Sequence, residues 1–450
     1  MGRLVIFGPL FYFFTLKEFV MQTIEEKAME LEARLSRHRI EDSEIEELEI
    51  QWEKDPRWKN VTRPYRASEV LNLRGTLNVE HTLANAGAAR LWKLLKTEKN
   101  LPAIGALTGN QAIQQVEAGL KIIYLSGWQV AADNNLTGDM YADQALYPSN
   151  SVPAVVRQIN RALRKADQIQ VLDCRRRGPY WFAPIVADGE DGFGGPIHTF
   201  EIMKEMIEAG AAGVHFEDQL SSAKKCGQLG GTVLVPIREF ITKLIAARLA
   251  ADVCGAPTLL IARTDAEEAR FVTSDIDERD RPYILAGEPR TPEGYYRYSG
   301  GIQAAIERGL AFAPYADMIW LETSSPDLDQ ARAFAEGIRK QFPDKMMSYN
   351  CSPLFNWKTS FDISTIQKFQ AELTAMGYVF QPVTLSGFHT MNPGMFDLAY
   401  SYKKEGLDAF ARFQDEEFKH RRSEGYMATS YQKFVGTGYF DRVMYCLTRE

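Results

Sequence analysis

Residues 213–217 have the sequence Gly213-Val214-His215-Phe216-Glu217, a short apolar run that ends in a polar residue. Continuous apolar runs of this length are typical of parallel strands that are buried on both faces. Seven further runs of the same kind occur along the chain. The eight expected strands cover residues 104–108, 122–126, 184–188, 213–217, 259–263, 318–322, 346–350 and 379–384.

Helical stretches are expected between these strands. Residues 240–253, which are rich in alanine and leucine, form one of them, and Gly119, Gly210 and Gly309 stand where helices are expected to end. An alternation of eight strands with helices predicts an α/β fold, a (β/α)8 barrel of the TIM type over residues 101–400. A doubly wound open sheet is the structural alternative, although it usually has fewer strands.

Two flanking segments complete the expected organisation, a helical segment over residues 21–100 and a C-terminal helical segment over residues 401–450. The first is rich in charge and includes a helix expected over residues 23–36. Residues 4–16 are strongly apolar but too short to span a membrane. We interpret residues 1–20 as an upstream extension before a natural start at Met21. An amphipathic docking helix and a signal peptide are the alternatives.

The composition excludes several classes of protein. The 450 residues carry 52 basic and 59 acidic side chains, a net charge of −7, which argues against nucleic acid as the main partner. The five cysteines are odd in number and contain no CxxC pair, so neither a disulfide framework nor a zinc site is expected. A cytoplasmic, reducing location without membrane contact fits best. P-loop, GxGxxG and Ser-His-Asp patterns are absent.

The polar residues that end the apolar runs are expected to converge, because the active sites of such barrels form at the carboxyl ends of the strands. Capping of the next helix is the alternative for any single one of them. His215 lies in the middle of its strand and is expected in the core or at the rim rather than in catalysis. The converging residues are Ser126, Asp188, Glu217, Arg263, Glu322, Asn350 and Thr384.

An acidic, glycine-rich loop follows the third expected strand. Asp188, Glu190 and Asp191 place three carboxylates within four residues, and Glu217-Asp218 offers two more after the next strand. Such a loop suits a hard divalent cation such as Mg²⁺. No histidine or cysteine lies nearby at zinc spacing. An acidic surface turn is the alternative interpretation.

The loop Lys224-Lys225-Cys226-Gly227 after the fourth strand is expected to act as a lid. The two lysines are expected to lower the pKa of the Cys226 thiol, so that it exchanges protons at neutral pH. An incidental cysteine on a basic loop is the alternative.

Other groups suit a substrate with two or three carboxylates. Ser126 and the backbone N–H groups that follow it can bind a small carboxylate beside Trp128, and Arg263 offers a bidentate fork for another. Residues 350–354 and Thr384 add neutral donors. These groups, together with a metal, predict a small polycarboxylate as the substrate.

The chain from about residue 21 resembles isocitrate lyase, within the isocitrate lyase and phosphoenolpyruvate mutase superfamily. Six motifs carry the resemblance: Ser126-Gly127-Trp128-Gln129-Val130-Ala131, Phe216-Glu217-Asp218-Gln219, Lys224-Lys225-Cys226-Gly227, Ala262-Arg263-Thr264-Asp265, Tyr349-Asn350-Cys351-Ser352-Pro353 and Val435-Gly436-Thr437-Gly438-Tyr439-Phe440.

The resemblance implies a reversible cleavage of isocitrate to glyoxylate and succinate, as in the glyoxylate cycle. It implies Mg²⁺ as the cofactor, with Mn²⁺ as a possible substitute, and a homotetramer that exchanges helices between subunits. Tyr124 is then the base for the substrate hydroxyl, and Cys226 protonates the carbanion-like succinate intermediate. Asp188 binds the metal, and Asp143, Glu190 and Glu217 hold its coordinated waters.

The resemblance also assigns the substrate contacts. Ser126, Gly127 and Trp128 hold the glyoxylate part. The remaining contacts, mostly to carboxylates, come from Gly227, Gln228, Arg263, Asn350, Cys351, Ser352, Pro353, Leu354 and Thr384.

Two positions depart from the family pattern. Gln228 stands where the family has histidine, and Leu354 stands where it has serine. Glutamine hydrogen-bonds a carboxylate but carries neither a proton nor a charge, and leucine adds apolar bulk to the expected succinate pocket. Two alternatives follow from these changes: a lyase for 2-methylisocitrate, and a catalytically impaired homologue kept for binding or assembly.

Overall fold

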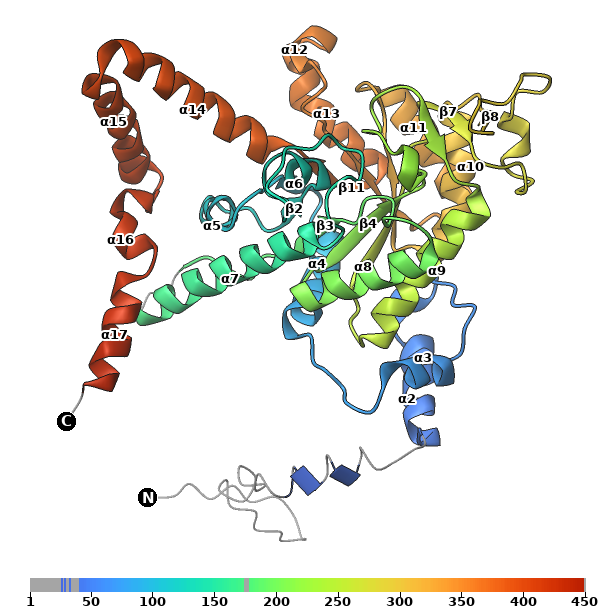
Figure 1. Cartoon of the computed structure of the whole chain (residues 1–450), viewed down its shortest axis with the longest axis horizontal. Coiled ribbons are helices and arrows are strands. Elements are labelled where there is room, and N and C mark those ends of the chain that lie inside the picture. The colour runs from blue at the N-terminus through green and yellow to red at the C-terminus, as the bar shows by residue number, and fades with distance from the viewer. Residues whose placement is uncertain (1–25, 27, 30–31, 34–39, 174–177, 449–450) are drawn as a thin grey trace. The chain divides into compact units, whose positions relative to one another are not determined.

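The computed structural model describes residues 26, 28–29, 32–33, 40–173 and 178–448. It divides into two compact units, one of residues 1–56 and 65–79 and the other of residues 57–64 and 80–450 (Figure 1). The apolar extension, the expected start at Met21 and most of the helix expected over residues 23–36 lie outside the described residues.

The first unit contains the helices α2 (Asp42–Lys54) and α3 (Ala67–Arg74). The start of α2 is capped by Glu44, whose side chain accepts a hydrogen bond of 3.3 Å from the backbone N–H of Glu41. Within this unit Trp52 packs edge-on against Tyr65 with ring centroids 6.2 Å apart.

The second unit is built on eight parallel strands, paired in the order β1-β11-β10-β9-β6-β4-β3-β2. A parallel bridge between Gly105 and Tyr124 joins the two end strands, so the sheet is a nearly closed barrel and the predicted (β/α)8 fold is confirmed. The strands are β1 (Leu101–Ile104), β2 (Ile123–Leu125), β3 (Ile185–Asp188), β4 (Gly213–Glu217), β6 (Leu259–Thr264), β9 (Met318–Leu321), β10 (Met346–Tyr349) and β11 (Tyr378–Val383).

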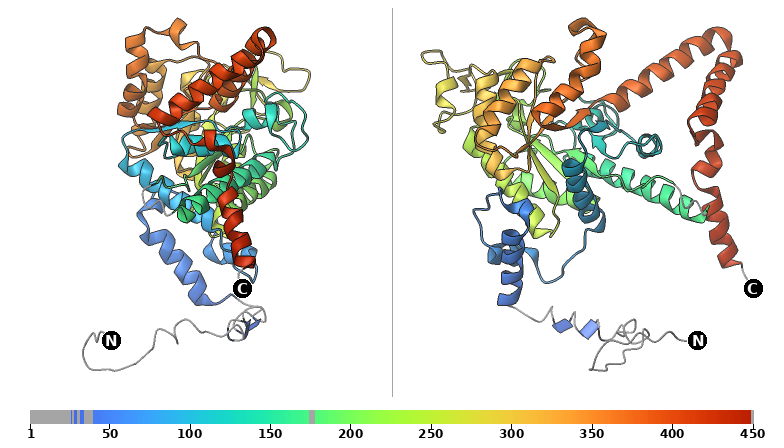
Figure 2. Two further views of the ribbon diagram at one scale, coloured as in Figure 1. Left: turned by 90° about the vertical axis from the view of Figure 1, so that its left-hand side faces the viewer. Right: turned by 180° about the vertical axis from the view of Figure 1, so that it is seen from behind.

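Helices that connect the strands cover this barrel, and α14 to α17 follow its last strand. A small separate sheet consists of β5 (Thr232–Leu234), β7 (Ala269–Val272) and β8 (Tyr296–Arg297) (Figures 1 and 2). No described helix has the length and apolar character needed to cross a membrane. The helices are α4 (Thr82–Thr97), α5 (Gly109–Glu117), α6 (Gly127–Asp133), α7 (Ser151–Leu172), α8 (Pro196–Ala209), α9 (Ile237–Val253), α10 (Ile302–Phe312), α11 (Leu328–Arg339), α12 (Trp357–Ser360), α13 (Ile363–Met376), α14 (Ser386–Glu405), α15 (Leu407–Ser423), α16 (Tyr431–Phe434) and α17 (Thr437–Leu447).

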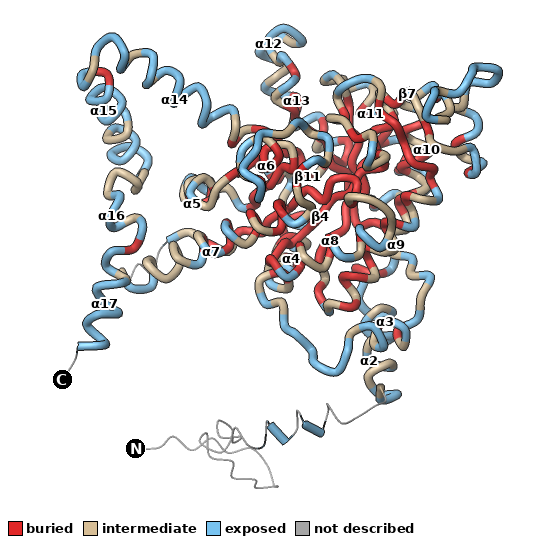
Figure 3. Tube along the Cα trace, in the orientation of Figure 1, coloured by how far each residue is buried: buried red, intermediate tan, exposed pale blue. Residues whose placement is uncertain are grey.

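Side chains along each strand alternate between the barrel interior and the outer helices. The interior core includes Tyr124, Ile261 and Trp320, and Leu91 from α4 closes it at the end where the strands begin. The strand residues that alternate with these inward ones, such as Val214 of β4, belong to a second core that packs against the helices. Figure 3 shows burial concentrated along the strands. The same alternation sends the polar residues at the strand ends toward the barrel axis.

Two details of the expected fold were wrong. The first strand covers residues 101–104 rather than 104–108, because Thr108 caps the start of α5 by accepting a hydrogen bond from the Gln111 backbone. Gly309 lies inside α10 instead of ending it. A Cβ at Gly309 would approach the Phe334 ring to 2.9 Å and Ile338 to 2.8 Å, so glycine here permits close packing of α10 on α11.

A buried ion pair ties α9 to the start of β9. The Arg248 guanidinium donates to the Asp317 carboxylate at 2.6 Å, and the backbone N–H of Leu260 donates to the same oxygen at 2.8 Å. Burial alone raises the pKa of Asp317, but Arg248 and Arg57 outweigh it and bring the pKa to about 2. Both charges of the pair are therefore present at neutral pH.

We expect Asp317→Ala to lower the free energy of unfolding by about 3–5 kcal/mol, because it leaves the Arg248 charge buried without its partner. Chemical denaturation followed by circular dichroism measures the change. The matched control is Glu98→Ala, which breaks an ion pair of similar length, 2.7 Å to Lys121, with both side chains partly exposed. That loss is expected to stay below about 1 kcal/mol. Equal losses of unfolding free energy in the two variants would contradict a stabilising role for the buried pair of Arg248 and Asp317.

Candidate active site

The polar residues at the strand ends come together at the carboxyl end of the barrel. Thr384 donates to Asn350 at 3.2 Å, and Asn350 donates to Glu322 at 2.9 Å. Arg263 lies 3.6 Å from Glu322 and 3.4 Å from Glu217. These contacts link the ends of five neighbouring strands, from β11 to β4, so one buried polar layer lies directly above the apolar interior.

Ser126 and Asp188 complete this layer from β2 and β3. Ser126 caps α6 by accepting from the Gln129 backbone, so the capping interpretation holds for this residue. Asp188 accepts from the backbone N–H groups of Gly127 and Glu190, both at 2.9 Å. Burial raises the pKa of Asp188, but His215, Lys224, Arg263 and the N–H group of Gly127 outweigh it and lower the pKa, so the carboxylate is charged.

Lys224 lies at the centre of the acidic groups. Its buried ammonium pairs with Asp143 and Glu190 and lies 3.3 Å from Glu217. Burial opposes the charge of Lys224, yet the surrounding carboxylates raise its pKa well above the usual range. Glu190 also accepts a hydrogen bond from the Tyr147 hydroxyl. The sequence singled out neither Tyr147 nor this role of Lys224. Tyr147 is far along the chain from Glu190, and Lys224 is far from Asp143 and Glu190.

The acidic cluster fits a divalent metal in its chemistry. Its donors are carboxylate oxygens, which Mg²⁺ prefers, and it already gathers around one positive charge. Within residues 40–173 and 178–448, however, no three His, Cys, Asp or Glu side chains stand in a geometry that would hold a metal ion, because the Lys224 ammonium occupies their centre. A metal would enter this cluster in exchange for that ammonium.

Two of the expected carboxylates lie outside the cluster, which corrects the prediction from the acidic loop. Asp191 accepts from Ser221 and lies 3.8 Å from Lys243. Asp218 accepts from the Thr264 hydroxyl at 2.7 Å. The alternation along β4 turns Glu217 inward, and the next residue therefore faces the outside of the barrel.

Tyr124 and His215 form a buried pair just below the rim. The Tyr124 hydroxyl lies 2.9 Å from His215 Nε2, and the same nitrogen is 3.5 Å from Asp188. Burial raises the pKa of Tyr124 well above its usual range and lowers that of His215 to about 4, so both side chains are neutral at neutral pH. His215 was expected in the core or at the rim rather than in catalysis, and it is fully buried. Its inward position in β4, two residues before Glu217, was the signal that could have placed it at the site.

The Cys226 thiol is half-buried beside the rim, and the expectation of a lowered pKa was wrong. Burial raises the pKa of Cys226 to about 12, with Asp143 as the next cause. Lys224 does not stabilise a thiolate because its charge is engaged by the carboxylate cluster. The thiol is therefore protonated at neutral pH.

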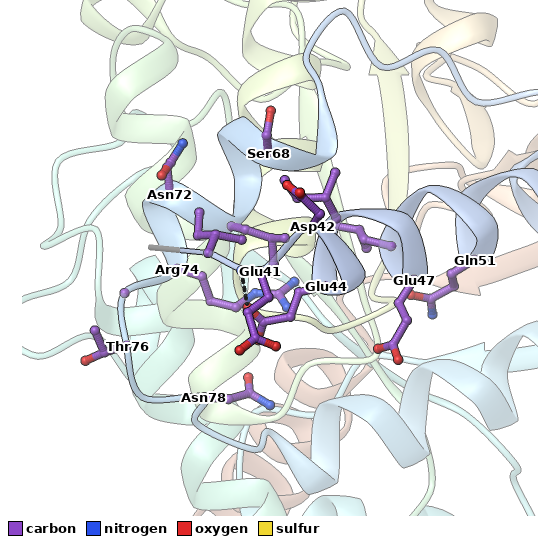
Figure 4. Close-up of a pocket in the computed structure, with 15 residues that line it drawn as sticks. Glu41, Asp42, Glu44, Glu47, Gln51, Ser68, Asn72, Arg74, Thr76 and Asn78 are labelled. Carbon is purple, nitrogen blue, oxygen red and sulfur yellow. Dashed lines mark hydrogen bonds between the residues drawn. The ribbon is translucent and has the colours of Figure 1, made fainter. Parts of the chain in front are cut away.

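A hollow in the first unit has a different character. It is lined by side chains of α2, α3 and the segment that follows (Figure 4), including Glu41, Glu44, Glu47 and Arg74. These carboxylates are exposed or half-exposed, whereas those of the barrel rim are buried against cations. The chemistry of the chain is therefore assigned to the barrel rim.

The comparisons with known proteins agree with this geometry. The sequence matches the model of the isocitrate lyase family over residues 44–288 and 286–449. The isocitrate lyase of Halalkalibacterium halodurans is 59% identical over 403 residues, which cover 90% of this chain and 93% of that protein. The chain belongs to the isocitrate lyase family. Isocitrate lyase 1 of Mycobacterium tuberculosis is 55% identical over 398 residues, with 88% and 92% covered.

Solved structures share the fold of this family member at low identity. A 2,3-dimethylmalate lyase of the PEP mutase/isocitrate lyase superfamily gives a TM-score of 0.54 at 19% identity, covering 79% of this chain and 94% of that one. A phosphoenolpyruvate phosphomutase from Streptomyces platensis also gives 0.54, at 18% identity, with 81% and 100% covered. At these identities the likeness concerns the fold alone.

The two positions that depart from the isocitrate lyase pattern lie in different surroundings. Gln228 faces the rim, where its side-chain oxygen accepts from the Ser352 hydroxyl at 2.9 Å. Its buried Nε2 makes no hydrogen bond within the described residues. Leu354 is 55% exposed. The backbone N–H of Leu354 donates to the Ser352 hydroxyl at 3.1 Å, so Leu354 follows directly on a rim residue, and its contribution of apolar bulk to the substrate pocket stays a prediction.

The remaining predicted substrate contacts lie around the same rim. Trp128 is partly buried and packs edge-on against Phe388, with ring centroids 5.0 Å apart. Cys351 is buried in the outer core and does not face the rim, in contrast to its expected substrate contact, because alternation after β10 turns Asn350 and Ser352 inward. Pro353 follows Ser352 in the same turn and is partly buried.

We expect Cys226 of the metal-free folded protein to react with iodoacetamide at pH 8 on the order of a hundredfold or more slower than in the urea-unfolded chain, because only the thiolate reacts. Its rate should still rise with pH above pH 10. Mass spectrometry of the Cys226 peptide measures both. Asp143→Asn should raise the folded-state rate, because it removes a charge that raises the pKa. Equal rates in the folded and unfolded chains would refute the raised pKa.

Proposed function

We propose that the protein is an isocitrate lyase, a carbon–carbon lyase that reversibly cleaves isocitrate to glyoxylate and succinate. Membership of the family over nearly the whole chain supports this activity. The observation that carries it is a protonated Cys226 thiol beside a rim that combines anion-binding groups with an acidic cluster. A tricarboxylate with a hydroxyl group needs both kinds of group.

The rim offers donors for the carboxylates of the substrate. Arg263 presents a buried guanidinium, and Asn350, Ser352 and Thr384 add neutral hydrogen-bonding groups. The Gln228 amide contributes a buried N–H group that has no partner among the described residues, and a substrate carboxylate would satisfy it. This assigns Gln228 a neutral binding role where the family has histidine.

The residues around Ser126 suit the glyoxylate part of the substrate. Ser126 and Gly127 start α6, whose N-terminus favours negative charge, and Trp128 provides an apolar wall. A Cβ at Gly127 would lie within van der Waals overlap of Glu190, so only glycine allows this close approach to the acidic cluster.

Two groups transfer protons in the proposed reaction. Cleavage leaves an electron pair on the carbon that becomes a succinate methylene, and the Cys226 thiol donates its proton to that carbon. Tyr124 takes the proton of the substrate hydroxyl. Because its own pKa is raised, Tyr124 must release its phenolic proton as it takes that of the substrate. His215 Nε2, 2.9 Å away, would receive this proton, and the Asp188 carboxylate 3.5 Å from the same nitrogen would stabilise the charged ring.

We assign a divalent metal, Mg²⁺ with Mn²⁺ as substitute, to the acidic cluster. Asp188 would bind it directly, and Asp143, Glu190 and Glu217 would hold its waters, since all four carboxylates surround Lys224. When bound, such an ion polarises the oxygens of glyoxylate as a Lewis acid. Closure of the loop over residues 224–227 would exclude water from the same space.

We further propose a cytoplasmic homotetramer with exchanged C-terminal helices. Helices α14–α17 carry apolar side chains that are more than half exposed in the single chain, among them Phe396, Tyr400, Leu407, Tyr431 and Leu447. A second subunit that covers these side chains removes an apolar surface of a size unusual for monomers. A mass of four chains in light scattering would support the assembly, and a monomeric mass would refute it.

We expect the purified protein to release glyoxylate from isocitrate with Mg²⁺ at rates on the order of 1 s⁻¹ or more. Cys226→Ala should lower kcat about 10²–10⁴-fold, because it removes the acid, with a smaller effect on KM. Glyoxylate formation in a coupled spectrophotometric assay measures both parameters. Absence of glyoxylate with Mg²⁺ and with Mn²⁺ would refute the proposed function.

The matched control is Cys254→Ala, which alters another partly buried cysteine, at the end of α9 and outside the rim, and should leave both parameters unchanged. Parallel assays with 2-methylisocitrate test the substrate. Isocitrate is expected to have the higher kcat/KM, in line with the similarity to isocitrate lyases, and a preference for 2-methylisocitrate would favour the alternative.

A further inference from the structure

Gln219, a fully buried residue two positions after β4, holds the start of the Cys226 loop by its side chain. Its amide nitrogen donates to the Lys225 carbonyl at 2.8 Å, and its amide oxygen accepts from the Lys225 N–H at 3.0 Å. One side chain therefore pairs both backbone groups of the residue before Cys226, as a neighbouring strand would. This pairing fixes the backbone from which the thiol projects.

The same amide nitrogen also donates to Asp265 at 2.5 Å, so the side chain makes three hydrogen bonds in all. The other carboxylate oxygen of Asp265 accepts from Arg263 Nε at 2.8 Å. Asp265 thus joins the loop, through Gln219, to the guanidinium that faces the substrate carboxylates. Both hydrogens of the Gln219 amide are used in these bonds, so the hydrogen-bonded connection from Lys225 to Arg263 consists of protein groups alone.

The loop also touches this ion pair directly. A Cβ built on Gly227 would lie 2.5 Å from Arg263 Nη2 and 2.7 Å from Asp265 Oδ1, so the loop backbone rests on the pair with no room for a side chain. Asp265 is itself fixed from behind, because its backbone N–H donates to Asp218 at 2.9 Å. Asp218 is paired at 3.0 Å with the fully buried Arg308. Buried groups therefore hold Asp265 in place.

We propose that Gln219 and Asp265 are positioning residues of the lyase reaction, a clamp that sets the Cys226 thiol in register with Arg263. Neither residue touches the reacting atoms. This role rests on the proposed function, because it requires Cys226 to act as the acid and Arg263 to hold a substrate carboxylate. The clamp keeps a fixed distance between Arg263, which binds the substrate, and Cys226, which protonates it.

The test compares Gln219→Glu with Gln381→Glu. The first variant removes the donors to Lys225 and Asp265 and sets two carboxylates against each other. The second is a matched control, because Gln381 is equally buried and its side chain also makes three hydrogen bonds, all through the amide nitrogen, to Gln370, Thr374 and Tyr378 on the far side of β11. A general loss of stability should affect both variants alike.

The first readout does not depend on activity. Trypsin cleaves after Lys224 and Lys225, and the Lys225 N–H is an exchangeable hydrogen held by Gln219. In Gln219→Glu, cleavage at these two bonds and hydrogen exchange over residues 220–229 should both be at least about tenfold faster than in the wild type. In Gln381→Glu they should be unchanged. Equal loop protection in the two variants would overturn the clamp.

The second readout is the split between kcat and KM for isocitrate. Displacement of the acid by about 1 Å costs on the order of a hundredfold in rate, so Gln219→Glu should lower kcat about ten- to hundredfold. KM should change less, because Arg263 keeps Glu217 and Glu322 as partners. A loosened loop with unchanged kcat would overturn the positioning role.

A rescue variant separates positioning from simple damage. Adding Asp265→Asn to Gln219→Glu removes the facing negative charges and restores a donor–acceptor pair between the two positions. Part of the lost loop protection and of kcat should return, and no return would contradict the clamp. If the wild type releases no glyoxylate, the proposed function fails, while proteolysis and exchange still decide whether the clamp exists.

Discussion

Closure of eight parallel strands is the constraint on which the rest of this structure depends. In a closed ring, every second side chain of a strand must enter the same interior, and the strands end at a common rim. The apolar layer around Trp320 fills that interior, and α4 covers its lower end. Inward-facing positions can then be polar only at the carboxyl ends of the strands, above the apolar interior. Charge and chemistry are therefore gathered at one place.

Burial at the rim explains the protonation states found there. Charges removed from water must be paired, and Lys224 and Arg263 pair with the carboxylates of four different strand ends and loops. Burial raises the pKa of Glu322 to about 7, although Arg263 and the neutral donors Asn350 and Trp320 oppose the rise. Burial keeps Cys226 a thiol, because it outweighs the opposing effect of Arg263 on the pKa. A protonated thiol suits a group that must give a proton away.

The sequence predicted the strands and the rim because both follow from periodicity. The rim residues, from Ser126 to Thr384, share the inward phase of their strands, and that phase can be read from the apolar runs alone. Errors arose where a local pattern met a tertiary contact. Gly309 resembles a helix end but serves helix packing. The lysines beside Cys226 resemble activators of a thiolate, but Lys224 pairs with carboxylates from distant segments.

The sequence by itself determined the barrel, the family and the set of residues that carry polar chemistry, because short-range periodicity and motifs are properties of the linear chain. Only the tertiary structure decided which of these residues face one another. It turned Asp191 away from the acidic cluster, brought His215 to Tyr124, and joined Gln219 to Asp265. Such contacts depend on distances between segments far apart along the chain, and on the burial that shifts their pKa values.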